Sequence, residues 1–113
     1  MKLKVIDPPR EFKAGASIII KDCAQIELQP DEQVTFLTEA GAEYDVARKI
    51  WGYYATPSLN GRLKSNGFKT ALTKNTVSGR FFVMLVEDSK QDLFTKYLIA
   101  ENIILLEWLD ERK

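Results

Sequence analysis

Histidine is absent from this sequence of 113 residues, and cysteine occurs once, at Cys23. Without histidine the chain cannot build a Ser-His-Asp or Cys-His nucleophile system, and it lacks the commonest metal ligand. A single cysteine forms neither an internal disulfide nor, without histidine, a zinc site. Acid–base chemistry would have to use Asp, Glu, Tyr or Lys. We therefore expect no metal site and no cofactor, and the composition favours a non-catalytic protein over an enzyme.

The chain also lacks net charge and long apolar runs. Sixteen basic and sixteen acidic residues cancel, so no general attraction to nucleic acid or to an anionic membrane is expected. One stretch, RLKSNGFKTALTK, is locally basic through Arg62, Lys64, Lys69 and Lys74. Weak nucleic-acid binding through these side chains is a further alternative. The zero net charge disfavours it, because dedicated nucleic-acid binders are usually strongly basic.

Nothing in the sequence suggests a membrane segment or an oxidising compartment. The longest apolar runs, FFVMLV and IILL, are far shorter than the roughly 20 residues that span a bilayer. Residues 1–15 contain no apolar run that resembles a signal peptide. We expect a cytoplasmic protein with no membrane contact.

The composition is that of an ordinary globular protein, with 45% hydrophobic and 28% charged residues. A chain of this length can bury one core, so we expect a single domain over residues 1–113. In the first half, apolar and β-branched patterns predict strands at 1–6, 17–21, 25–29, 33–38 and 43–54. Two prolines are expected to stop the first strand and leave 7–15 as an extended connection. Cys23, between the second and third strands, is expected to be a small buried side chain.

The second half is predicted to contain a strand–helix–strand unit. Residues 80–87 and 103–109 are apolar on both faces, which is typical of central strands, often paired in parallel. Between them Ser89-Lys90-Gln91-Asp92 resembles a capping box that opens a helix through about Glu101, in which an apolar stripe is predicted. This connection is long enough for a crossover.

Together with a strand at 68–74, these elements give the order β-α-β-β-α-β over residues 43–109, which is the order of ferredoxin-like folds. We predict an α+β fold, mainly an antiparallel sheet or roll with two helices and a carboxyl-terminal β-α-β unit. A small β-barrel with two helices is the alternative.

A short helix over about 59–65 is predicted from signals at both of its ends. Ser58 can cap its amino terminus, and the Asn-Gly pair that ends at Gly67 suits the left-handed conformation that terminates helices. In that arrangement Phe68 packs back on Leu63.

The rival interpretation makes Asn60-Gly61 the turn of a two-residue hairpin, because Asn-Gly is a strong hairpin signal. Gly61 inside a helix costs about 1 kcal/mol. We prefer the helix because Leu59 and Leu63 are four residues apart and share a helical face.

The same region is the best candidate for a ligand site. Free amides at a helix start and the Arg62 guanidinium would attract a carboxylate or phosphate, and aromatic rings would offer a stacking wall. Glycine would let a ligand approach the backbone. Ordinary packing of aromatic strand residues explains the same composition. The candidate ligand-binding residues are Trp51, Tyr53, Tyr54, Ser58, Asn60, Gly61 and Arg62.

From the sequence we expect a small non-catalytic binding or accessory module that recognises a protein partner or a small polar or anionic ligand. The alternative is a small enzyme for an anionic or sugar-like substrate, with Tyr54 or Asp45 transferring a proton and Arg62 stabilising charge. Acidic residues at 31, 32, 39, 43 and 45 are expected to be ordinary exposed turn residues. A homodimer is left open, with an edge strand at 1–6 or 33–38 as one means of pairing.

Overall fold

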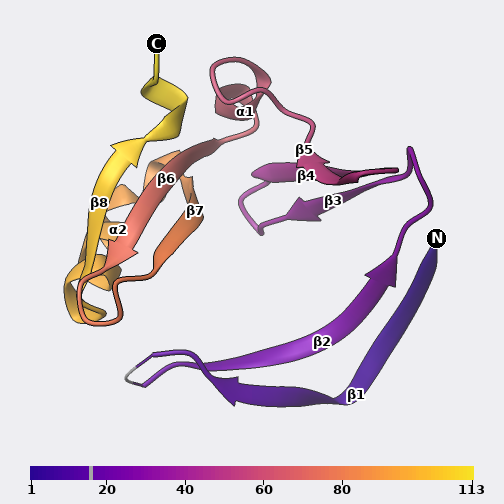
Figure 1. Cartoon of the computed structure of the whole chain (residues 1–113), viewed down its shortest axis with the longest axis horizontal. Coiled ribbons are helices and arrows are strands. Elements are labelled where there is room, and N and C mark those ends of the chain that lie inside the picture. Colours follow the sequence, from indigo (N-terminus) through magenta and orange to yellow (C-terminus); the bar gives the residue numbers. More distant parts are fainter. Residues whose placement is uncertain (16) are drawn as a thin grey trace. The chain divides into compact units, whose positions relative to one another are not determined.

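The computed structural model describes residues 1–15 and 17–113 and confirms an α+β fold with antiparallel sheets (Figure 1). None of the sheets formed by these residues closes into a barrel. The strands are β1 (Lys2–Lys13), β2 (Ile19–Glu27), β3 (Gln33–Leu37), β4 (Glu43–Lys49), β5 (Gly52–Ala55), β6 (Phe68–Asn75), β7 (Phe81–Glu87) and β8 (Ile103–Trp108). The helices are α1 (Arg62–Ser65) and α2 (Gln91–Ala100), with 3-10 turns η1 (Asp88–Lys90) and η2 (Leu109–Glu111).

The strands form a two-stranded sheet β1-β2 and two three-stranded sheets, β3-β4-β5 and β7-β6-β8. The chain also divides into two compact units. The first unit contains Met1–Gln33 and Ala47–Tyr54, and the second contains Val34–Val46 and Ala55–Lys113. A single domain over the whole chain stays a prediction.

The carboxyl-terminal β-α-β unit is present. β6 pairs antiparallel with both β7 and β8, so β7 and β8 run in the same direction with β6 between them. α2 connects them and packs on the sheet, where the Phe94 and Trp108 rings lie 5.9 Å apart between centroids. The predicted capping box is wrong, since Ser89 lies in η1 and no side chain caps α2.

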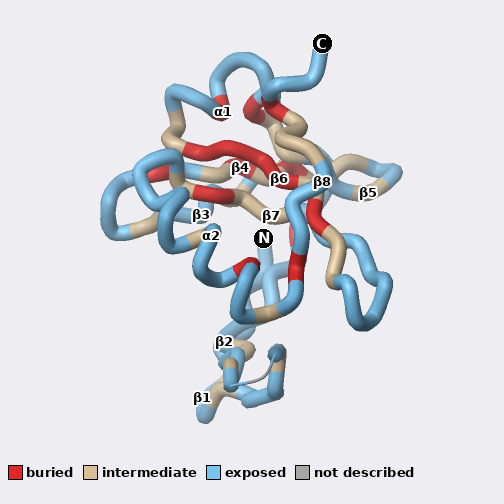
Figure 2. The backbone as a smooth tube through the Cα atoms, turned by 90° about the vertical axis from the view of Figure 1, so that its left-hand side faces the viewer, coloured by how far each residue is buried: buried red, intermediate tan, exposed pale blue. Residues whose placement is uncertain are grey.

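The predicted centre of this sheet is wrong. The apolar runs of β7 and β8 suggested central strands buried on both faces, yet both strands lie at edges of the sheet. Exposed residues include Phe81, Phe82 and Val83 in β7 and Ile104, Leu105 and Leu106 in β8. The central strand is β6, in which Ala71 and Thr73 are fully buried. Figure 2 shows buried residues along β6. The order β-α-β-β-α-β is present from β5 to β8, because the strand predicted at 43–54 is divided. The strands β4 and β5 belong to a different sheet from β6 to β8, so these elements do not share one ferredoxin-like sheet.

The core of the second unit lies beside α1. Ala42, Leu63 and Phe68 form a buried cluster, against which Tyr44 and Leu85 pack. The Tyr44 and Phe68 rings meet edge to face, with centroids 6.3 Å apart. The predicted contact between Phe68 and Leu63 is therefore confirmed.

Three local predictions for the β1–β2 ribbon are wrong. β1 continues through the prolines that were expected to stop it, because a register shift between Val5 and Arg10 accommodates residues that cannot donate to the ladder. β2 is one continuous strand where two were predicted. Cys23 is exposed rather than buried, because a two-stranded ribbon has no layer beneath it. The strand predicted at 43–54 is also divided, by a turn at Ile50 and Trp51.

Candidate functional site

The structure divides the predicted ligand site between the two units. Trp51, Tyr53 and Tyr54 belong to the first unit, whereas Ser58, Asn60, Gly61 and Arg62 belong to the second. The three aromatic side chains are 68%, 54% and 46% exposed. The Trp51 and Tyr54 rings lie 6.1 Å apart, and the Arg48 guanidinium lies 5.8 Å from the Tyr53 ring centre.

Helix α1 is a single turn that begins at Arg62, three residues later than predicted. Asn60 and Gly61 lie in the turn before it and do not connect two strands, so the hairpin interpretation is wrong. Ser58 organises this turn: its hydroxyl accepts the Arg62 N–H at 3.4 Å, and its carbonyl accepts the Leu63 N–H at 3.2 Å. A Cβ on Gly61 would lie 2.3 Å from the Ser58 hydroxyl, so glycine lets this turn close.

The Arg62 side chain is already engaged by a carboxylate. Its Nη1 lies 2.8 Å from Oδ2 of Asp45, and its Nη2 donates to the Thr56 hydroxyl at 3.4 Å. Asp45 was expected to be an exposed turn residue, but it lies in β4 and is 4% exposed. Its other oxygen accepts the Thr35 hydroxyl at 2.5 Å. The Thr35 hydrogen bond, followed by the Arg62 hydrogen bond, lowers the pKa of Asp45 although burial opposes the shift. This cluster neutralises Arg62, which makes it a weaker anion contact than a free guanidinium.

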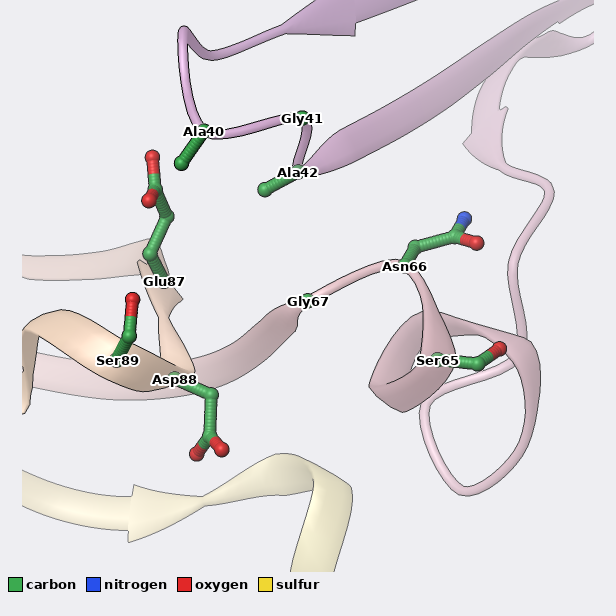
Figure 3. Close-up of a pocket in the computed structure, with 9 residues that line it drawn as sticks. All are labelled: Ala40, Gly41, Ala42, Ser65, Asn66, Gly67, Glu87, Asp88 and Ser89. Carbon is green, nitrogen blue, oxygen red and sulfur yellow. The ribbon is translucent and has the colours of Figure 1, made fainter.

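The sequence reasoning missed a polar pocket of about 330 Å³ in the second unit (Figure 3). Three turns meet there: the turn between β3 and β4, the end of α1, and the end of β7. Its lining residues are Ala40, Gly41, Ala42, Ser65, Asn66, Gly67, Glu87, Asp88 and Ser89. No motif identifies these residues in the sequence, because most are small and come from three separate turns.

The pocket chemistry suits a small hydrogen-bonding molecule. Glu87 lies 3.5 Å from the Lys90 ammonium, and Asp88 accepts the Gln91 amide at 3.0 Å. Gly67 has a φ of +93°, and a Cβ there would lie 3.3 Å from the Ala42 Cβ. Glycine therefore permits the close approach of two of the three turns. Glu87 and Ser89 point toward the turn between β3 and β4 (Figure 3), and their oxygens offer acceptors for donor groups of a ligand.

The β1–β2 ribbon carries an apolar surface on one face. Alternate residues of β2 point to the same side, and the register places residues of β1 opposite them, such as Leu3 opposite Ile26 and Phe12 opposite Ile20. Five large members of this face, Leu3, Val5, Phe12, Ile20 and Ile26, are 58%, 68%, 44%, 43% and 39% exposed. We call Leu3, Val5, Phe12, Ile20, Ala24 and Ile26 the ribbon face. The sequence reasoning missed it because the second strand was divided at Cys23.

The four basic side chains of residues 62–74 do not form a free cationic patch. Lys69 is buried, with its ammonium 3.1 Å from Asp110 and 3.4 Å from Glu111. Arg62 is paired with Asp45. This pairing reduces the charge available to a phosphate backbone.

Across residues 1–15 and 17–113, no group of three or more acidic, cysteine or histidine side chains is placed to hold a metal ion. Within the same ranges, every helix is too short or too polar to cross a bilayer. No protein family, curated protein or solved structure matches the chain.

Proposed function

We propose that this protein is a non-catalytic binding module that attaches to a protein partner through the ribbon face. The observation that carries the proposal is the segregation of side chains by the β1–β2 register. Leu3, Val5 and Ile26 lie on one side, whereas Lys2 and Glu27 pair across the other at 3.8 Å. A ribbon that is amphipathic in this way has a surface built for contact with apolar groups.

The physics of a two-stranded sheet supports the same conclusion. A two-stranded ribbon is marginally stable in water without a third strand or a packed layer. β1 and β2 are long strands, exposed along almost their whole length, and Figure 2 shows this exposure. Each Val or Leu side chain removed from water stabilises by about 1.5–3 kcal/mol. A partner that covers the ribbon face would therefore stabilise both the complex and the ribbon.

The charges on the ribbon favour a protein partner over an anionic surface. On the apolar side Arg10 forms an ion pair with Asp22, and the nitrogen and oxygen lie 3.2 Å apart. This pair is internally neutral and offers both a donor and an acceptor at the centre of the face. An apolar protein surface with a polar group at its middle matches that pattern.

The experiment compares Val5→Lys on the ribbon face with Lys4→Glu on the opposite face. Proteins captured by the wild-type chain are purified, and their dissociation constants for each variant are measured by calorimetry. We expect Val5→Lys to weaken a true partner at least about tenfold, because a buried charge replaces an apolar contact. Lys4→Glu should change binding less than about threefold. Equal binding by Val5→Lys and wild type would overturn the proposal.

A second candidate function is recognition of a small polar ligand in the pocket between the three turns. The observation that favours it is the pocket volume of about 330 Å³ with two carboxylates in its wall, which lies at the small end of ligand sites. A thermal-shift screen against sugars, nucleotides, amines, small carboxylates and phosphate tests it, with Glu87→Gln as the pocket variant and Arg62→Ala as the comparison. A shift lost only in Glu87→Gln assigns the pocket, and a shift lost only in Arg62→Ala assigns the turn at α1.

The enzyme alternative has weaker support. Asp45 is ion-paired with Arg62 and its pKa is lowered by Thr35 and Arg62, so its carboxylate stays charged near neutral pH. A permanently charged carboxylate is poorly suited to donate a proton. Tyr54 belongs to the other unit.

A further inference from the structure

The β7 strand has an open edge. It is the outer strand in the order β7-β6-β8. The Arg80 carbonyl accepts the Asn75 N–H at 2.9 Å, and the Asp88 N–H donates to the Gly67 carbonyl at 3.0 Å. Even-numbered residues of this segment therefore direct their backbone groups toward the β6 side. Because the direction alternates along a strand, Phe81, Val83 and Leu85 direct theirs toward the free edge.

The central part of this edge lacks the residues that usually keep exposed strands from pairing. Residues 81–86, FFVMLV, contain no charge, proline or glycine, and protected edges usually carry at least one such residue. Phe81, Phe82 and Val83 are 61%, 45% and 63% exposed, so side chains on both faces of the strand are accessible. The strand also contains no bulge, since its pairing with β6 continues without a register shift from Phe81 to Glu87.

We propose that two copies of this chain pair antiparallel through β7, with Met84 opposite Met84 of the second copy. Charge complementarity indicates that the strand on this edge is a second copy of β7. Arg80 stands immediately before the apolar run, and Glu87 and Asp88 stand at its end. In this register Arg80 of each copy faces Asp88 of the other, so two complementary charge pairs flank an apolar centre. Arg80 is exposed and forms no ion pair within residues 1–15 and 17–113.

Symmetry permits this register, and the charges at the two ends of the strand select it. A two-fold axis perpendicular to the sheet keeps each side chain on its own face, so residues with the same parity must oppose one another. With Met84 on the axis, the outward-facing residues Val83 and Leu85 become hydrogen-bonded partners. Parallel pairing would instead bring Arg80 near Arg80 and Asp88 near Asp88, which like-charge repulsion disfavours. The proposal is independent of the ribbon face, which belongs to other strands.

The first test is sedimentation velocity of the full chain over a range of concentrations. We expect a wild-type dimer that dissociates on dilution. Val83→Pro should be monomeric at concentrations where the wild type is dimeric, because it removes an outward N–H that the β6 ladder does not use. Val83→Lys should do the same by placing charge on the edge. Val77→Lys, at a loop residue that is 81% exposed, is the matched control and should leave the dimer intact.

The second test examines the charge pairs without changing the strand. Arg80→Glu should raise the dimer dissociation constant about tenfold, because two pairs become repulsive. Asp88→Arg should do likewise, and the double variant Arg80→Glu/Asp88→Arg should return to within about threefold of wild type. In a Cys23→Ser background, Met84→Cys should cross-link two chains under a mild oxidant, because non-hydrogen-bonded antiparallel partners lie close enough for a disulfide.

The results of these two tests show whether two chains pair through β7. A wild type that is monomeric at every concentration overturns the proposal, as does a dimer that survives Val83→Lys and Arg80→Glu with the circular dichroism of the wild type. A dimer that Met84→Cys fails to cross-link overturns the register. If Val83→Pro does not fold, the Arg80→Glu variant still tests the proposal, because Arg80 is exposed and its substitution leaves the strand unchanged.

Discussion

The Lys69 ammonium lies 3.1 Å from Oδ2 of Asp110, and the two side chains are 10% and 0% exposed. The other Asp110 oxygen accepts the Thr70 N–H at 3.0 Å. The Lys69 ammonium also lies 4.7 Å from the centre of the Trp108 ring. These contacts attach η2, near the carboxyl terminus, to the beginning of the central strand β6.

Asp110→Ala should lower the free energy of unfolding by about 3 kcal/mol, because it leaves the Lys69 charge buried without its main partner. Asp110→Asn should cost less, since its side-chain oxygen can still accept the Thr70 N–H. Urea denaturation measures both. Glu111→Gln is the control: Glu111 lies 3.4 Å from the same ammonium but is 59% exposed, so its loss should cost at most about 1 kcal/mol. If Asp110→Ala lowered the free energy of unfolding as little as Glu111→Gln does, the buried pair would be unimportant for stability.

Arg62→Ala should destabilise the chain by about 1 to 2 kcal/mol, because buried Asp45 loses the guanidinium that lies 2.8 Å from its Oδ2. Lys64→Ala changes an exposed side chain in the same helical turn, and it should remain within about 0.5 kcal/mol of wild type. The comparison uses denaturant unfolding at neutral pH. An Arg62→Ala protein as stable as wild type would mean that water replaces the guanidinium without loss, which would leave Arg62 free for a ligand.

Leu63→Ala should cost about 3 kcal/mol, because Leu63 is fully buried against Ala42 and Phe68 and its truncation opens a cavity. Leu59→Ala is the matched control, since Leu59 is four residues earlier and 40% exposed. Its loss should stay below about 1 kcal/mol. Thermal unfolding of the two variants beside wild type measures the difference. A Leu59→Ala protein as unstable as Leu63→Ala would place both leucines in the core.

Stability should fall in acid because of two buried carboxylates. Thr35 and Arg62 lower the pKa of Asp45. For Asp110, burial raises the pKa, but the Thr70 N–H and Lys69 together lower it by more than burial raises it. The pKa of Asp110 therefore lies below its ordinary value. A lowered folded-state pKa stabilises above the unfolded value, about 3.9, and that stabilisation is lost as pH falls through the folded value.

Unfolding free energies should therefore stay level near neutral pH and decline below about pH 4. Asp45→Asn and Asp110→Asn should each be less stable than wild type at neutral pH, with a shallower decline in acid. Urea titrations at a series of pH values test this. An acid decline that neither variant reduces would assign the pH dependence to other carboxyl groups.

Local patterns in the sequence predicted those elements whose signals lie within a few residues. Alternation predicted β3, an apolar stripe predicted α2, and the Asn-Gly pair predicted the left-handed Gly67 at the end of α1, where φ is +93°. The contact between Leu63 and Phe68 followed from that helix ending. These features depend on backbone sterics and side-chain period, which neighbouring residues determine.

Tertiary structure decided which strand is central and which charges meet. The run FFVMLV was predicted to be a core strand because all of its residues are apolar. Its burial, however, depends on which strands and helices pack beside it. Lys69 and Asp110 are 41 residues apart in the chain, and no local pattern pairs them. The ribbon face likewise exists only because the register with β1 aligns apolar residues on one side of β2. Amino-acid sequence by itself therefore determined the α+β class and most element positions, while pairing between distant segments, which depends on three-dimensional packing, decided the surfaces and ion pairs.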